Sequence, residues 1–96
     1  MIKHIVLFKL EGDNKLEFMK EIKLELENLL DKIEELKTME VGISYIEDED
    51  MPDLSLISSF ENKEGLAIYQ KHPEHVKVGK KLRTRMAGRS VVDYTY

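Results

Sequence analysis

The chain contains no cysteine, so several kinds of chemistry are excluded at once. A disulfide framework, a thiolate nucleophile and cysteine-ligated zinc are impossible, and the absence suits a reducing compartment. No stretch approaches the roughly 20 apolar residues of a membrane span. The apolar start, Met1 to Phe8, lacks the small-residue cleavage site of a secretion signal. We therefore expect a cytoplasmic protein without a membrane segment.

The composition is that of a soluble globular protein: of 96 residues, 42% are hydrophobic and 35% are charged. This length corresponds to one domain. A monomer of this size hides only about 60–65% of the surface of its unfolded chain. Its hydrophobic core is therefore small, and self-association would bury additional surface and stabilise the fold.

The net charge is −4, but the charges are unevenly distributed. Most acidic residues lie within 11–53, whereas 71–89 holds seven lysines and arginines and a single acid, Glu74. This basic run is either the solvated face of a helix or a feature that attracts an anionic ligand. Nucleic acid is not an expected partner, because the overall charge is negative and aromatic and basic residues do not interleave.

Hydrophobic periodicity predicts four strands and three helices. Alternation indicates strands over 2–10, 38–46, 54–60 and 90–96. The first helix is predicted over 15–30, with Asn14 as N-cap and Glu17 reaching back to it. Asn62 is expected to cap the second helix, which Pro73 ends; a third helix starts at Pro73 and stops at Gly88.

The resulting order, β-α-β-β-α-α-β, predicts a ferredoxin-like α+β fold with four antiparallel strands and helices on one face. The first strand is apolar on both faces, with Val6 and Phe8 on one and Ile5 and Leu7 on the other. A monomer would leave one apolar face in water. We therefore expect a homodimer in which two sheets pack face to face.

Five segments carry a family resemblance: MIKHIVL at 1–7, MEVG at 39–42, DLSL at 53–56, YQKHPEHV at 69–76 and DY at 93–94. Together they resemble the stress-responsive A/B barrel (Dabb) family over nearly the whole chain. The resemblance implies a single domain over 1–96 that forms a dimeric α/β barrel. It does not imply one activity, since members include a plant polyketide cyclase and stress-associated assembling proteins.

The resemblance to the cyclase implies specific site residues. Its catalytic tyrosine and histidine correspond to Tyr69 and His75, and its pocket-side histidine to His4. The cyclase has a further pocket histidine on its third strand, where residues 54–59 of this chain contain none. We therefore expect a related pocket that takes a different ligand.

Each candidate residue also has a structural interpretation. His75 titrates near neutrality and would act as a general base, or it is hydrogen-bonded across the Pro73 kink. Tyr69 would donate to a developing oxyanion, or it only packs its ring. His4 is a ligand-facing group or a satisfied core histidine, with Asp93 as its expected charge partner. The predicted pocket lining is Ile5, Val6, Leu7, Phe8 and Asp93.

No metal or cofactor is expected. His72 and His75 are three residues apart, but Pro73 disturbs regular helical placement between them. Methionines at core positions are ordinarily packing rather than haem ligands. No glycine-rich phosphate loop and no nucleophile elbow is present.

Two functions remain open. One is an enzyme or binding protein for a small aromatic or polyketide-like molecule, with acid–base chemistry by His75 and Tyr69. The other is a non-catalytic, stress-related assembly module. An open cavity at His75 and Tyr69 favours the first, and a space filled by Phe8, Phe60 and Tyr94 favours the second.

Overall fold

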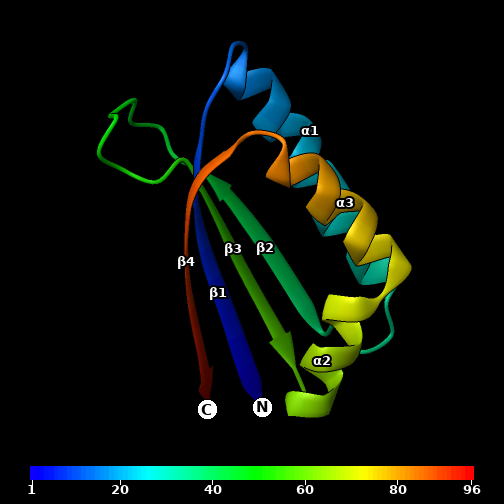
Figure 1. The fold of residues 1–96 in the computed structure, drawn as a ribbon. Coiled ribbons are helices and arrows are strands. Elements are labelled where there is room, and N and C mark those ends of the chain that lie inside the picture. Colours follow the sequence, from blue (N-terminus) through cyan, green and yellow to red (C-terminus); the bar gives the residue numbers. More distant parts are fainter.

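A computed structural model describes residues 1–96 and has the predicted ferredoxin-like fold (Figure 1). One antiparallel sheet has the strand order β2-β3-β1-β4. In chain order the elements are β1 (Ile2–Leu10), α1 (Lys15–Asn28), a 3-10 turn (Leu29–Asp31), β2 (Thr38–Ile43), β3 (Leu54–Phe60), α2 (Lys63–Lys71), α3 (Pro73–Arg83) and β4 (Met86–Thr95). No helix is long and apolar enough to cross a membrane.

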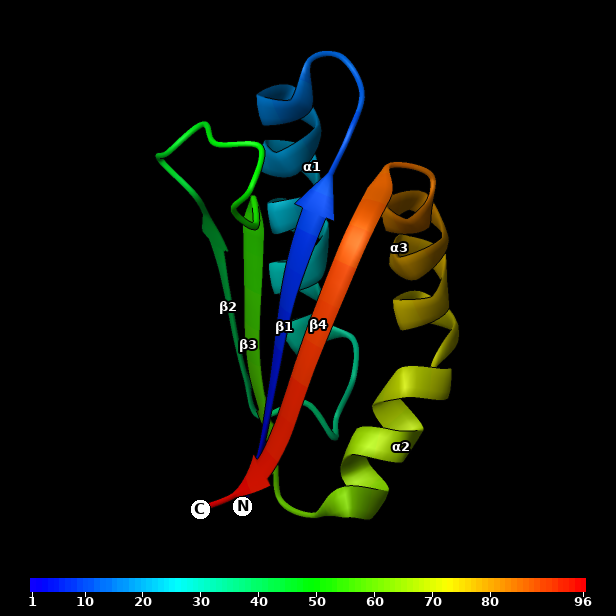
Figure 2. The ribbon, with the colours of Figure 1, turned by 60° about the vertical axis from the view of Figure 1, so that its left-hand side comes forward.

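The central strand β1 divides the molecule into two faces, because its side chains alternate. Ile2, Val6 and Phe8 are buried beneath the helices. Ile5 points the other way and is aligned with Ile57 of β3 and Val92 of β4. All three helices lie on one side of the sheet (Figure 2). The other face is free of helices and exposes apolar side chains, as the two-sided pattern of β1 predicts.

Helix capping agrees with the sequence at Asn62 but not at Asn14. The Asn62 side chain accepts a hydrogen bond from the Gly65 amide at 2.8 Å, as an N-cap does. Asn14 instead adopts a left-handed conformation, with φ of 54°, and makes no side-chain cap. The predicted capping box is wrong, because that backbone directs the side chain away from the first turn.

As predicted, α2 ends just before Pro73 and α3 begins at Pro73. His72, between the two helices, caps the second one. His72 Nδ1 accepts a hydrogen bond from the Glu74 amide at 3.1 Å, so this histidine is the N-cap of α3. The predicted end at Gly88 is wrong: α3 ends at Arg83, and Gly88 lies within β4 opposite Lys9. Pairing with the full length of β1 extends β4 back to Met86.

The helices are not equally close to the sheet. Helix α1 packs on β2, α2 lies against β3 and β1, and α3 packs mainly on the other two helices. Helix α3 is therefore held away from the strands that it faces. The space between α3 and the β1–β4 half of the sheet holds the candidate site.

Candidate functional site

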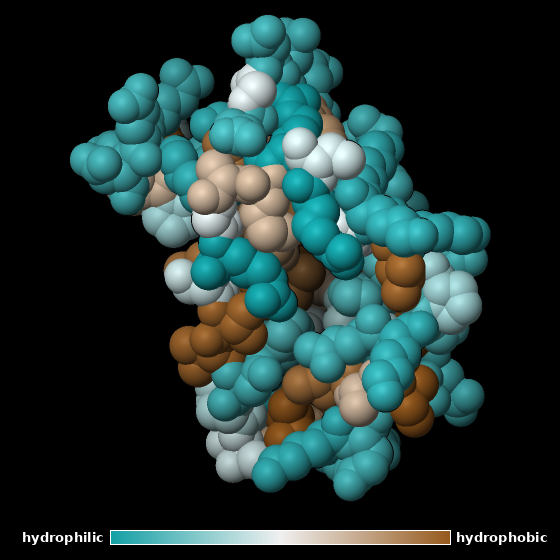
Figure 3. Space-filling model, in the orientation of Figure 1, coloured by the Kyte–Doolittle hydropathy of each residue, from teal (hydrophilic) through white to brown (hydrophobic).

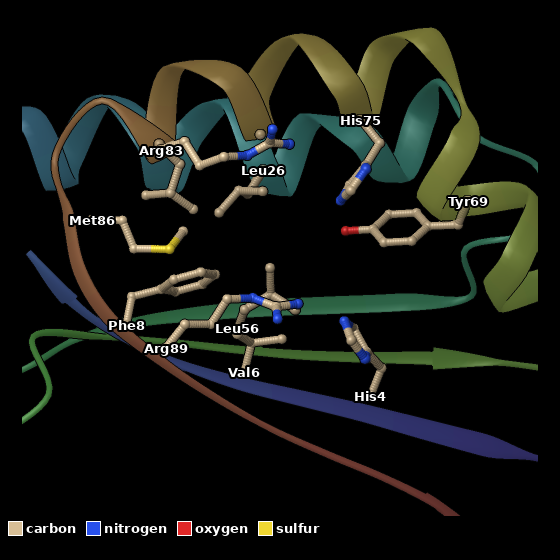
Figure 4. A pocket seen from close by; sticks show the side chains of 12 residues that line it. His4, Val6, Phe8, Leu26, Leu56, Tyr69, His75, Arg83, Met86 and Arg89 are labelled. Carbon is tan, nitrogen blue, oxygen red and sulfur yellow. The ribbon is translucent and has the colours of Figure 1, made fainter.

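A cavity of about 380 Å³ lies between the sheet and α3. Figure 3 shows the molecular surface in the orientation of Figure 1, with a hollow near its centre that is edged largely by hydrophilic residues. One end of the cavity is apolar and the other carries Tyr69, His75 and His4 (Figure 4). The apolar lining comprises Val6, Phe8, Leu26, Leu56, Leu82 and Met86.

Tyr69 is fully buried, yet its hydroxyl group has no hydrogen-bond partner. The Phe60 ring packs against the Tyr69 ring with 5.0 Å between centroids, and the hydroxyl points into the cavity between His75 and His4 (Figure 4). Buried polar groups without a partner are rare and call for an explanation. Burial raises the pKa of Tyr69, so the hydroxyl stays protonated and is available as a donor.

His75 lies beside Tyr69, with 4.4 Å between the ring centroids. Its Nδ1 is 3.1 Å from the Gln70 carbonyl oxygen. Because a carbonyl only accepts, Nδ1 carries the proton and Nε2 keeps a free lone pair. Burial lowers the pKa of His75, and the positive charges of Arg83 and Arg89 lower it further, against the Gln70 hydrogen bond. The imidazole is therefore neutral near pH 7 and able to accept a proton.

His4 and Asp93 form the predicted pair. They are register partners on β1 and β4, and His4 Nδ1 is 2.5 Å from Asp93 Oδ1. The carboxylate accepts from Nδ1–H, so in the neutral imidazole the lone pair is on Nε2. His4 is 4% exposed, and it lines the cavity opposite His75 (Figure 4).

Arg83 and Arg89 also line the cavity, although the sequence did not single them out individually. The available signals were the basic run at 71–89 and the spacing of His75, Gly79 and Arg83 by four, which places them on one face of a helix. Neither guanidinium group has a hydrogen bond or an ion pair within the protein. They carry positive charge into a site that contains two histidines.

The residues of the predicted lining lie on both faces of the sheet. Val6 and Phe8 line the cavity, and Asp93 reaches it through His4. Ile5 and Leu7 do not line it, because strand alternation places them on the helix-free face. His72 serves as a helix cap, and no group of three histidine, aspartate or glutamate side chains is placed to hold a metal ion.

Comparison with known proteins gives a consistent match. The model of the Stress Responsive A/B Barrel Domain family matches residues 2–96. A stress-response A/B barrel domain-containing protein of Arabidopsis thaliana is 34% identical over 82 residues, covering 78% of this chain and 68% of that protein. A dimeric protein of unknown function from Bacteroides fragilis, with a ferredoxin-like fold, has a TM-score of 0.89 and 37% identity, covering 99% of this chain and 95% of its own.

A second solved structure, of another Arabidopsis thaliana protein, has a TM-score of 0.86 at 26% identity. It covers all of this chain and 95% of its own. The shared architecture therefore extends from the first strand to the last.

Proposed function

The chain belongs to the stress-responsive A/B barrel family, and we propose that it is an acid–base enzyme acting on a small, largely apolar molecule in the cavity. The observation that carries this proposal is the buried, unpartnered hydroxyl of Tyr69 beside the neutral imidazole of His75. A ligand oxygen would give Tyr69 the acceptor that the protein itself does not provide. Aromatic or polyketide-like compounds suit the apolar end of the cavity.

The proposed reaction begins with proton abstraction next to a carbonyl group. His75 Nε2 takes the proton from carbon, and the electron pair of the C–H bond moves onto the carbonyl oxygen. The Tyr69 hydroxyl donates a hydrogen bond to the resulting enolate oxygen. Protonated His75 then returns its proton to carbon as the carbonyl group reforms. Alternatively, the enolate electron pair forms a C=C bond as the C–O bond of a β-oxygen breaks, and the departing oxygen takes the proton; either route restores the neutral base.

His4 has a supporting role in this proposal. Its Nε2 is a second acceptor on the opposite wall, held in one tautomer by Asp93. It would orient a donor group of the ligand toward His75. Asp93 acts only through His4 and is a positioning residue.

The working unit is proposed to be a homodimer. The helix-free face exposes apolar side chains, with Val92 59%, Tyr94 44% and Leu7 38% exposed. Packing this face against a second copy removes that area from water, and the Bacteroides fragilis relative is described as dimeric. The cavity lies on the opposite side of the sheet, so each subunit would keep its own site.

The assembly-module alternative is weaker on this geometry. It requires bulky side chains to fill the site, but Phe8 only forms a wall and Phe60 lies behind Tyr69. Tyr94 is the register partner of Lys3, on the helix-free face. An open cavity with unsatisfied acid–base groups favours a ligand.

Phenylpyruvate tests the proposal without knowledge of the natural substrate, because its methylene protons lie next to a carbonyl. We expect the protein to accelerate exchange of those protons for deuterium, followed by NMR. His75→Gln should abolish the acceleration, and Tyr69→Phe should reduce it by about 100-fold, as loss of an oxyanion donor does.

His72→Asn is the matched control, since it removes an imidazole outside the cavity and keeps a capping side chain. The proposal is wrong if the wild-type protein does not accelerate exchange and phenylpyruvate leaves the His75 NMR signals unchanged. It is also wrong if His75→Gln, folded as judged by circular dichroism, is as active as the control.

A further inference from the structure

Arg83 and Arg89 have no ion pair or hydrogen bond to the protein, whereas Lys77, Lys81 and Arg85 of the same basic run do. Lys77 pairs with Glu74 at 3.5 Å, and Lys81 bridges Glu21 and Glu25. Arg85 donates to the backbone carbonyl oxygens of Glu11 and Asp13. The two arginines that line the cavity are thus left free, in a chain whose overall charge is −4.

The cavity itself offers them no counter-ion. Its lining includes the two arginines and two histidines but no aspartate or glutamate. The nearest acid to His4 is Asp93, which already accepts the His4 Nδ1 proton. The site therefore has an excess of positive charge beside an apolar surface, where an anion gains more from a cation than it does in bulk water.

The positions of the two guanidinium groups suggest which part of a ligand they would meet. Arg83 lies along α3 on one wall and Arg89 extends from β4 on the opposite wall, so both guanidinium groups lie near the middle of the length of the cavity (Figure 4). Phe8 and Met86 lie on one side of them, and Tyr69 and His75 on the other (Figure 4). The Arg83 guanidinium group lies beside Gly79, whose Cβ position would be 3.6 Å from Arg83 Nη2.

We propose that Arg83 and Arg89 bind the carboxylate of the substrate, which is therefore a small apolar carboxylic acid. The carboxylate lies between the two guanidinium groups, and the hydrocarbon part lies against Phe8 and Met86. The reacting carbon is within a few bonds of the carboxylate, next to Tyr69 and His75. This inference rests on the proposed acid–base function and adds its substrate class.

Guanidinium groups suit this role because they bind carboxylates through paired N–H donors. Both arginines are exposed, so solvent screening weakens each interaction. We therefore expect Arg83 and Arg89 together to select for an anionic ligand, and each arginine alone to make a moderate contribution to the binding free energy.

The test compares phenylpyruvate with phenylacetone, in which a methyl group replaces the carboxylate. Both probes are titrated into the intact protein and binding is measured by NMR. The wild-type protein should bind phenylpyruvate at least 10-fold more tightly than phenylacetone. Arg83→Gln and Arg89→Gln should each weaken phenylpyruvate binding by roughly 10-fold, the scale of one charge-assisted hydrogen bond, and leave phenylacetone binding unchanged.

Lys80→Gln serves as the control, because it removes a positive charge from the same helix outside the cavity. Equal binding of the two probes, or arginine variants indistinguishable from Lys80→Gln, would overturn the carboxylate inference. The acid–base proposal would survive that result if phenylacetone still undergoes exchange dependent on His75. Failure of both probes to bind contradicts both proposals.

Discussion

The proposed chemistry of the site depends on two neighbouring side chains, Tyr69 and His75, whose ionisation is set largely by burial. Tyr69 is kept protonated and His75 is kept neutral, since burial disfavours the charged form of each. One therefore remains a donor and the other an acceptor at neutral pH. The pair is suited to holding a ligand oxygen and removing a nearby proton in the same step.

His75 should titrate below its ordinary pKa of about 6.5. Because the unfolded chain keeps the ordinary value, it binds more protons than the folded state in the window between the two pKa values. The free energy of unfolding should therefore rise with pH across that window and fall on acidification. An NMR titration of the histidine ring protons checks this, and a His75 pKa at or above 6.5 contradicts it.

Some residues of the site were predictable from the sequence and others were not. The pairing of His4 with Asp93 was predictable, because both lie on strands whose alternation fixes the face. The roles proposed for Arg83 and Arg89 were not, because a basic run does not reveal which of its charges are neutralised. Lys81 belongs to the same run, but its acidic partners lie on α1 and only the fold brings them together.

At the scale of elements, Asp53 joins the start of β3 to the end of β1. It is 5% exposed and accepts a hydrogen bond from the Leu10 amide at 2.9 Å. Lys9 and Lys15 lie 3.3 and 3.2 Å from its carboxylate. Burial alone would raise the pKa of Asp53, but the Leu10 amide and the two ammonium groups outweigh it and lower the pKa.

Asp53→Ala should destabilise the fold by about 1–3 kcal/mol, because it leaves the buried Leu10 amide without an acceptor. The lowered pKa also means that the carboxylate stabilises the fold above its ordinary pKa of about 3.9, and that this is lost as pH falls through the folded value. Urea unfolding at pH 7 and pH 3 measures both effects. A variant as stable as wild type at pH 7 contradicts the role.

Two substitutions at Gly79 distinguish an effect on helix stability from an effect on cavity volume. Gly79→Ala should stabilise the protein by up to about 1 kcal/mol, since glycine is unfavourable within a helix and the added Cβ makes an ordinary contact with Arg83. Gly79→Leu should project into the cavity and weaken phenylpyruvate binding relative to Gly79→Ala. Thermal unfolding and NMR titration test the pair, and equal affinities would show that the cavity does not hold the ligand.

Element boundaries were predictable where one local interaction decides them. Asn62 and Pro73 act within a single turn, and the structure follows them. Gly88 failed as a stop signal because β1 offers a long partner strand, and strand pairing overrides a local preference. Asn14 failed because its backbone conformation follows from the turn at 11–14.

At the scale of the whole molecule, the two faces of the sheet have different roles. One face and the helices enclose the cavity, while the other is proposed to meet a second copy. The fold class was predictable because the strand and helix order determines it. The cavity was not, because it depends on how far α3 is held from the sheet by the other helices.

Val92→Glu should dissociate the proposed dimer, since it places a charge on the helix-free face. Leu24→Glu is the matched control: Leu24 is 63% and Val92 59% exposed in the single chain, but Leu24 lies on α1. Sedimentation velocity should give a monomer for Val92→Glu and a dimer for wild type and control. A monomeric wild-type protein would rule out the proposed dimer.

The central claim is that the cavity beneath α3 binds a small molecule at its acid–base end. A crystal structure of the protein soaked with phenylpyruvate tests it most directly. We expect density in this cavity, with a ligand oxygen within hydrogen-bond distance of the Tyr69 hydroxyl. An empty cavity, with the ligand absent or bound elsewhere on the protein, would contradict the claim.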